Sequence, residues 1–460
     1  ALAINTAVSF VTNTNWQAYA GETALSHFSQ MFGLGVQNFL SAATGLAVAV
    51  AMARGFARQS SKTIGSFWVD LVRTILYILL PLAILFALAF TSQGVMQNFA
   101  SNVTASGIDQ TSQLIPMGPV ASQTAISLLG SNGGGFFGVN SAHPLANPTP
   151  ISNMIELFAI LLLPVAAPVM FGRLCGNPKH GKTLLYVMLG LFMTTLVAAL
   201  CCEVLPQINS ANAAGLEGKE TRFGIASSVL WALSTTATSN GSVNAALSSM
   251  SPLTGGLAML NMMFGEVVFG GVGSGIYGMV MFAILTVFIA GLMVGRTPEY
   301  LGKKIEAQQM RFAVLAVVAP SAVILLGTAL TLTLPFGLSS LSSKGPHGLS
   351  EALYAFTSAA ANNGSSFAGI NADTTFLNLA LALAMVIGRY VVIIPALAIA
   401  GTVAVKKVTP FSPGSFPVTG WLFGGLLAAV VVIVGALTFL PALSLGPILE
   451  HLLMLSGRTF

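Results

Sequence analysis

Long apolar stretches separated by short polar segments run through the whole chain. A helix needs ~20 mostly apolar residues to cross a bilayer, and eight stretches reach that length. We expect membrane spans at about 28–53, 68–92, 151–171, 183–204, 255–295, 312–335, 374–405 and 420–443. The stretch at 255–295 is interrupted by several glycines. This pattern predicts an all-α, polytopic membrane protein.

Four further apolar segments are too short to cross a membrane, at about 7 to 14 residues each against the ~20 required. They are Asn5 to Val11, Ser122 to Leu129, Phe223 to Thr236 and Ser350 to Ala360. Irregular backbone is tolerated at membrane depth only where it is buried in protein or lines an aqueous path. We therefore interpret these segments as re-entrant pore helices that enter the membrane and stop.

A polar triplet follows each of these short helices. The four triplets are Thr12-Asn13-Thr14, Ser131-Asn132-Gly133, Ser239-Asn240-Gly241 and Asn362-Asn363-Gly364. A single Asn-Gly pair usually marks only a surface turn. Four copies in register, with Thr14 aligned to the third-position glycines, instead indicate one site built four times.

The repeats divide the chain into units of span, pore helix, filter triplet and span. We predict unit one at 1–65, unit two at 66–178, unit three at 179–308 and unit four at 309–408, with a C-terminal span and tail at 409–460. Unit one lacks a leading span and the chain does not begin with Met. We therefore expect an upstream portion that this sequence does not include.

Composition and charge agree with a membrane location. The chain is 55% hydrophobic and 7% charged, with a mean hydropathy of +0.84. Twelve of its eighteen Lys and Arg residues lie in four short loops, which the positive-inside rule places in the cytoplasm. These are Arg54, Arg58, Lys62, Arg173, Lys179, Lys182, Arg296, Lys303, Lys304, Arg311, Lys406 and Lys407. The net charge of +5 therefore reflects topology, not nucleic-acid binding, and the triplets face outside.

Two nucleotide-binding patterns occur in the wrong context. Gly176 to Thr183 matches a phosphate-binding loop, but no strand precedes it and a span follows. Gly273 to Gly278 spells a dinucleotide fingerprint inside a membrane segment. The three Cys and five His residues have no disulfide or metal-site spacing. We expect no nucleotide or organic cofactor in this chain.

The triplets themselves suggest the ligand. None contains a carboxylate, the group that sites for Ca²⁺ or other small hard cations usually recruit. Potassium filters replace the hydration shell of the ion with backbone carbonyls from four segments, and glycine allows the backbone angles that direct those carbonyls inward. The C-terminal ends of the pore helices would add partial negative charge. The pattern is therefore typical of a K⁺ filter.

Longer motifs identify a family resemblance. Ala7 to Gln17, Ser131 to Pro144, Gly265 to Gly275 and Gly295 to Lys304 strongly resemble the potassium-binding A subunit of the bacterial Kdp potassium-transporting P-type ATPase. The resemblance implies a potassium-channel-like fold of the K⁺-transporter superfamily. It also implies high-affinity K⁺ import across the bacterial cytoplasmic membrane, together with a catalytic B subunit that hydrolyses ATP, a C subunit and a small F subunit.

Other residues have two possible interpretations each. Arg389 lies deep in a span and must face protein or water. It could form a structural ion pair, whereas the resemblance implies a cation below the filter that impedes leak. Gln17 could form a packing hydrogen bond, whereas the resemblance implies a place at the start of an intersubunit ion path. The glycine-rich segment with Glu266, Gly271, Gly273 and Gly275 suits either an unwound gate or close helix packing.

Two other functional classes differ from an ATPase subunit in the features that they need. A stand-alone K⁺ channel, or an uptake protein driven by an ion gradient, would share the four-unit fold. An intramembrane enzyme would need a Ser/His/Asp set, a His-Glu metal motif or paired carboxylates, and none lies at usable spacing.

Overall fold

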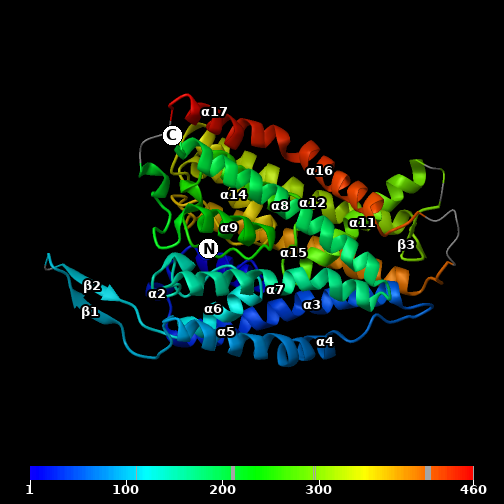
Figure 1. The fold of residues 1–460 in the computed structure, drawn as a ribbon, viewed down its shortest axis with the longest axis horizontal. Coiled ribbons are helices and arrows are strands. Elements are labelled where there is room, and N and C mark those ends of the chain that lie inside the picture. The colour runs from blue at the N-terminus through cyan, green and yellow to red at the C-terminus, as the bar shows by residue number, and fades with distance from the viewer. Residues whose placement is uncertain (110, 209–212, 294, 296, 410–415, 459–460) are drawn as a thin grey trace.

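The computed structural model describes residues 1–460 except 110, 209–212, 294, 296, 410–415 and 459–460. Arg296, one of the basic loop residues, lies outside the described residues. Most helices run along the long axis of the molecule (Figure 1). In the described part of the chain, eight helices are long and apolar enough to cross a membrane. They are Ser29–Ala57, Phe67–Ser92, Pro150–Leu174, Pro178–Val204, Ser274–Met293, Ala307–Thr333, Thr375–Ala404 and Trp421–Leu455.

The helices and strands are described here by the predicted unit in which they lie. The first expected unit holds α1 (Leu2–Val11), α2 (Gly21–Ala24), η1 (Ser29–Gly35) and α3 (Val36–Ala57). The second holds α4 (Phe67–Thr74), η2 (Ile75–Leu79), α5 (Leu80–Ser92), β1 (Val103–Ser106), β2 (Ser112–Ile115), α6 (Val120–Leu129), η3 (Asn140–Ala142) and α7 (Pro150–Leu174).

The second half of the chain continues the pattern. The third expected unit holds α8 (Pro178–Ile208), η4 (Ala213–Leu216), α9 (Gly224–Ala237), η5 (Leu247–Ser249), α10 (Pro252–Met263), α11 (Ser274–Met293), β3 (Glu299–Tyr300) and β4 (Lys303–Lys304). The fourth holds α12 (Ala307–Thr333), α13 (Pro335–Leu338), α14 (Gly345–Ala360) and α15 (Thr375–Ala404). The chain continues with α16 (Trp421–Leu443), η6 (Ser444–Ile448) and α17 (Leu449–Leu455).

The stretch expected to be an interrupted span at 255–295 consists of two helices, α10 and α11, joined by an irregular segment from Phe264 to Gly273. Three glycines there have positive φ angles: Gly265 (82°), Gly270 (64°) and Gly273 (86°). Glu266 and Phe269 also have positive φ, at 57° and 68°. Because a right-handed helix cannot accommodate these angles, the helix unwinds here.

The burial of the spans separates central from peripheral helices. The most apolar window of α11 is 78% buried, whereas that of the Phe67–Ser92 span is 28% buried. Helix α11 is therefore central and is surrounded by protein. The Phe67–Ser92 span is peripheral and leaves large apolar side chains such as Trp68, Tyr77 and Leu88 exposed. In a membrane protein, such exposed faces contact lipid.

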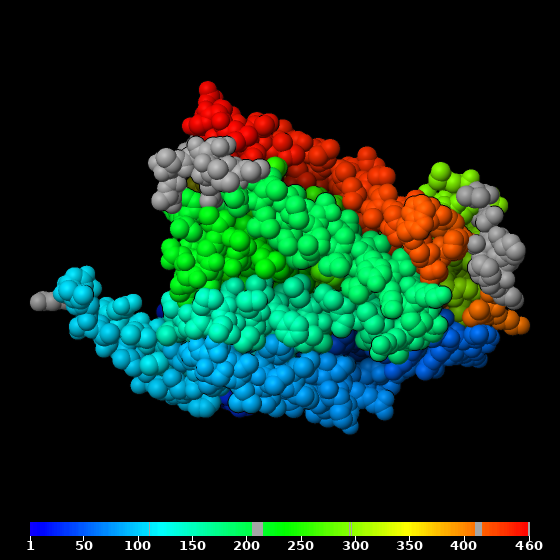
Figure 2. Space-filling view, viewed as in Figure 1, coloured from blue at the N-terminus to red at the C-terminus, as the bar shows by residue number. Residues whose placement is uncertain are grey.

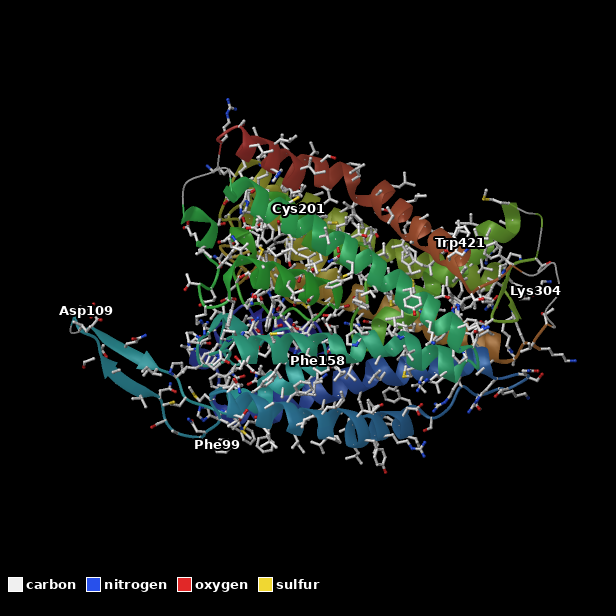
Figure 3. All side chains as sticks on the ribbon, in the orientation of Figure 1. Phe99, Asp109, Phe158, Cys201, Lys304 and Trp421 are labelled. Carbon is white, nitrogen blue, oxygen red and sulfur yellow. The ribbon has the colours of Figure 1, made fainter. Side chains whose placement is uncertain are left out.

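Two small hairpins lie at opposite ends of the molecule. The β1–β2 hairpin pairs Val103 with Ile115 and projects beyond the helices at the end where the short helices α6, α9 and α14 lie (Figure 1). The β3–β4 hairpin carries Lys304 at the other end, and Figure 3 labels Asp109 and Lys304 at these extremes.

A hydrogen-bonded pair attaches the C-terminal helix α17 to α14. His347 Nδ1 lies 2.7 Å from Glu450 Oε1, and Ser350 Oγ donates to Glu450 Oε2 over 3.2 Å. The hydrogen bond with Glu450 raises the pKa of His347, and the negative charges of Glu450 and Glu351 act in the same direction. Protonated His347 is thus the form that the fold stabilises.

This pair makes a pH-dependent contribution to stability. Because the pKa of His347 is higher in the folded state, the contribution is fully present below the unfolded pKa, ~6.5, and is lost as pH rises through the folded pKa. A hydrogen bond to a charged group contributes about 1.5–3 kcal/mol. We expect Glu450→Gln to lower the thermal midpoint at pH 6 more than at pH 9, measured by unfolding scans in detergent. An equal loss at both pH values would contradict the assignment.

Candidate ion filter

The four short helices end in the same backbone arrangement. After α1, α6, α9 and α14, a backbone N–H bonds to the carbonyl five residues earlier, at 2.8 to 2.9 Å. The four bonds run from Thr14 to Ser9, from Asn132 to Ser127, from Asn240 to Thr235 and from Asn363 to Ser358. In each case the residue before the donor has positive φ: Asn13 (62°), Ser131 (49°), Ser239 (48°) and Asn362 (48°). Each chain therefore turns sharply out of its helix at an equivalent position.

These equivalences correct the alignment of the first triplet. The sequence alignment matched Thr14 with Gly133, whereas the backbone matches Thr14 with Asn132 and Asn15 with Gly133. Asn15 has a φ of 55°, in the left-handed region where Gly241 (89°) and Gly364 (99°) also lie. Asparagine tolerates this conformation better than most residues. The first segment thus has Asn where the other three have Gly.

The four segments meet around Gly133. A Cβ atom on Gly133 would lie 2.6 Å from the carbonyl oxygen of Asn363, 2.7 Å from that of Thr14 and 3.1 Å from that of Asn240. These carbonyls belong to the fourth, first and third segments. A Cβ on Gly364 would likewise lie 2.2 Å from the Thr14 carbonyl oxygen. The four segments therefore form a closed ring. At position 133, only glycine leaves room for the carbonyl oxygens of the other three segments.

Side-chain hydrogen bonds run from each segment to the next around the ring. Asn363 Nδ2 donates to the Thr235 carbonyl over 2.8 Å, which connects the fourth segment to the third. Asn240 Nδ2 donates to the Ser127 carbonyl over 3.2 Å, which connects the third to the second. Asn132 Nδ2 donates to Asn13 Oδ1 in the first segment.

The circuit closes between the first and fourth segments. Asn362 Nδ2 donates to Thr14 Oγ1 over 2.9 Å and to the Met385 carbonyl over 3.0 Å. Ser41 of α3 supports the other side of the first segment, because its hydroxyl donates to Asn13 Oδ1 over 2.6 Å. The triplet side chains are at most 8% exposed. These buried side chains therefore hold the segments against one another, while the Thr12 and Ser131 carbonyls accept hydrogen bonds from Arg389 and Asn13.

The corrected alignment predicts how position 14 responds to substitution. Thr14→Asn should be tolerated, because asparagine occupies the equivalent positions 132, 240 and 363. Thr14→Gly should weaken K⁺ affinity by about tenfold, because it removes the hydroxyl that accepts from Asn362, and an unsatisfied buried donor costs about 1–3 kcal/mol. Titration of K⁺-dependent transport measures both. Better function in Thr14→Gly than in Thr14→Asn would contradict the alignment.

A recess of about 520 Å³ lies beside the segments, lined by Asn15, Gly241, Gly364 and Gln17 among others. Gln17 Oε1 accepts from the Gly135 N–H over 2.9 Å, and Gln17 Nε2 donates to Tyr19 over 3.2 Å. Gln17 therefore forms the packing hydrogen bond between the first two segments. Its place in an ion path remains a prediction.

On the other side of the ring, Arg389 reaches the first segment. Arg389 Nε donates to the Thr12 carbonyl over 2.6 Å. The adjacent Gly388 allows this approach, since a Cβ there would lie 1.9 Å from the Ala360 carbonyl oxygen at the end of α14. Arg389 and Glu266 both line a small cavity of about 50 Å³. No salt bridge joins Arg389 to a carboxylate within the described residues.

The glycine-rich segment connects this cavity to α9. The Gly270 N–H bonds to the Ala237 carbonyl over 2.8 Å, and Glu266 Oε2 accepts from Ser274 Oγ over 2.8 Å. A Cβ on Gly275 would lie 1.6 Å from the Phe269 carbonyl oxygen, and one on Gly273 would lie 2.1 Å from that of Gly45 in α3. Gly271 lies outside any helix. Gly275 therefore serves the tight, unwound turn, whereas Gly273 lets this segment approach α3.

The family is shown by sequence comparison. The potassium-transporting ATPase A subunit family matches residues 1–452. The chain belongs to this family. The potassium-binding subunit of the potassium-transporting ATPase from Rhodospirillum centenum is 56% identical over 467 residues, covering 100% of this chain and 81% of the relative. Its counterparts from Sorangium cellulosum and Pseudomonas aeruginosa are each 55% identical, and each alignment covers 98% of this chain. The alignments cover 82% and 81% of those relatives.

A solved structure shares the fold. The crystal structure of the potassium transporter TrkH from Vibrio parahaemolyticus matches with a TM-score of 0.56 at 16% identity, covering 85% of this chain and 76% of that chain. This chain thus shares its fold with a protein named as a K⁺ transporter. The predicted family resemblance, the all-α membrane class and the potassium-channel-like fold are confirmed.

The polar support behind the first segment was not predicted from the sequence. Asn15 Nδ2 donates to Asn38 Oδ1 over 2.6 Å, and Ser41 lies one turn further along α3. Both α3 side chains are buried. One feature of the sequence could have indicated this support. Asn38 and Ser41 are polar residues three positions apart in an otherwise apolar span, so they lie on one helix face.

Proposed function

We propose that this chain selects K⁺ from the outer side of the bacterial cytoplasmic membrane in a filter made of the four triplets and Asn15. The observation that supports this most directly is the convergence of carbonyls from the first, third and fourth segments on Gly133 of the second segment. Neutral carbonyl oxygens replace the hydration shell of a large monovalent cation without binding it too tightly to leave. The buried triplet side chains are all neutral.

The proposed function includes delivery of K⁺ to a catalytic P-type ATPase B subunit, in a complex with a C subunit and a small F subunit. Membership of the A subunit family supports an ATPase complex. In this arrangement the basic loops face the cytoplasm and the four units each supply one wall of the filter. Arg389 impedes direct passage below the ring, the Phe264 to Gly273 segment acts as a gate, and Gln17 lies near the start of the path to the partner.

Two measurements test the proposal. Crystals of the intact complex grown in Rb⁺ should show an anomalous peak among the carbonyls of Thr14, Asn240 and Asn363. Absence of a peak there, with Rb⁺ bound elsewhere in the same crystals, would rule out the filter assignment. Affinity purification of the tagged chain should recover a P-type ATPase subunit in equal amount.

The second candidate is a stand-alone K⁺ channel or gradient-driven uptake protein. The shared fold with the potassium transporter TrkH favours it. In this case the chain would purify without an ATPase and would carry K⁺ into liposomes without ATP. The purification experiment therefore distinguishes the two functions.

A further inference from the structure

A long groove lies between α8, α10 and α16, away from the filter. Its volume is about 1070 Å³ and its lining is mostly apolar. Figure 2 shows α8 and α16 side by side on one face of the molecule, and the two helices are in contact. Along α8 the groove extends from Lys179 to Ala198. At 1.5 Å per residue this is ~28 Å, close to the ~30 Å thickness of the bilayer hydrocarbon.

Glycines keep the groove open. Gly190 of α8 and Gly425 of α16 both line it, and a Cβ on either would meet no atom within 4 Å. By contrast, Gly424 makes the helix contact, since its Cβ would lie 3.3 Å from Val187 Cγ2. A glycine inside a helix destabilises it relative to alanine. Packing between the two helices does not require Gly190 or Gly425, and the space beside both glycines is open.

The groove has a basic end. Lys179 and Lys182 line it within the first two turns of α8, near the helix N-terminus, where the helix dipole adds partial positive charge. Both side chains are exposed, and neither forms a salt bridge with any described carboxylate. Trp421 is 88% exposed and lies at the same end of the molecule as Lys304 (Figure 3). Tyr186, also on the groove, is 66% exposed. Exposed Trp and Tyr are typical of the membrane interface.

We propose that this groove binds an anionic phospholipid of the phosphatidylglycerol type. Its phosphate lies at Lys179 and Lys182, and one acyl chain lies along Gly190 and Gly425. Basic pockets between membrane helices at the cytoplasmic side are suited to anionic head groups. A transmembrane helix of a partner would fill the apolar part but would have no use for the two lysines at its end. The inference depends on the membrane location and not on the K⁺ filter.

Native mass spectrometry of the purified, delipidated complex tests the proposal. Phosphatidylglycerol or phosphatidylcholine with identical acyl chains is added, and bound lipid is counted. We expect a preference of about tenfold for phosphatidylglycerol, which corresponds to 1.4 kcal/mol. Lys179→Gln combined with Lys182→Gln should abolish the preference. Lys62→Gln combined with Lys407→Gln removes the same charge from exposed positions elsewhere and should leave the preference unchanged.

A second variant tests the apolar part without changing charge. Gly190→Leu fills the groove from a position where a side chain meets no neighbour, so folding should be preserved and checked by the thermal midpoint. It should reduce binding of the first phosphatidylglycerol at least fivefold. Equal lipid binding in wild type and both groove variants would overturn the proposal. So would cross-linking of Gly425→Cys to another protein chain in native membranes, which would show that protein covers the groove.

Discussion

Gly133→Asp is expected to abolish high-affinity K⁺ uptake. The Cβ alone would lie within 2.6 to 3.1 Å of carbonyl oxygens from three other segments, so the ring must open to accept it. The added carboxylate would also hold a cation too strongly or repel the neighbouring carbonyls. Growth of a K⁺-uptake-deficient strain at micromolar K⁺, together with Rb⁺ uptake, measures the effect.

Two comparison variants make this prediction specific. Gly133→Ala adds only the Cβ and should weaken apparent K⁺ affinity by on the order of tenfold or more, since overpacking typically costs about 1–3 kcal/mol. Gly176→Asp places the same carboxylate in an exposed turn between two spans, where a Cβ meets no atom within 4 Å, and should leave uptake unchanged. Assembly of each variant is checked by co-purification. Unchanged affinity in Gly133→Asp would refute the filter assignment.

Arg389→Ala is expected to make the protein leaky to K⁺ and uncouple transport from ATP hydrolysis. Arg389 Nε donates to the Thr12 carbonyl, and its side chain lines the cavity shared with Glu266. Two like unit charges 4 Å apart repel by about 4 kcal/mol at an effective dielectric of 20. Removal of the guanidinium should therefore raise passive K⁺ efflux by more than tenfold.

Efflux from liposomes that contain the purified complex, measured without ATP, tests this expectation. Arg389→Lys keeps the positive charge and should remain much less leaky than Arg389→Ala. Arg73→Ala removes an exposed arginine from a peripheral span and should not change efflux. Full ATP-coupled uptake in Arg389→Ala, with efflux at the wild-type level, would show that the arginine has only a structural role.

Much of the architecture could be predicted from the sequence. The short helices end at Val11, Leu129, Ala237 and Ala360, within one residue of the predicted ends. These ends are local features, since polar residues follow each apolar segment, and two of the residues that adopt the left-handed conformation there are asparagines, which tolerate it well. The unwound segment before Ser274 was predictable for the same reason, because several glycines occur together.

The register of the first filter segment could not be predicted. Thr12-Asn13-Thr14 resembles the other triplets by its central Asn, but the backbone hydrogen bond from Thr14 to Ser9 shifts the equivalence by one residue. The residue at the glycine position is therefore Asn15, and its side chain bonds to Asn38 on α3. A partner on another helix supports an unusual residue, and the segment alone does not reveal that partner.

The sequence by itself determined the membrane class, the spans, the four short helices and the absence of carboxylates from the triplets. These follow from hydrophobic length and local backbone preference, which act over a few residues. Only the tertiary structure decided that the ring closes, that Arg389 reaches Thr12 and that glycines open a groove at Gly190 and Gly425. Such contacts join residues up to 377 positions apart, and their distances depend on how whole helices pack.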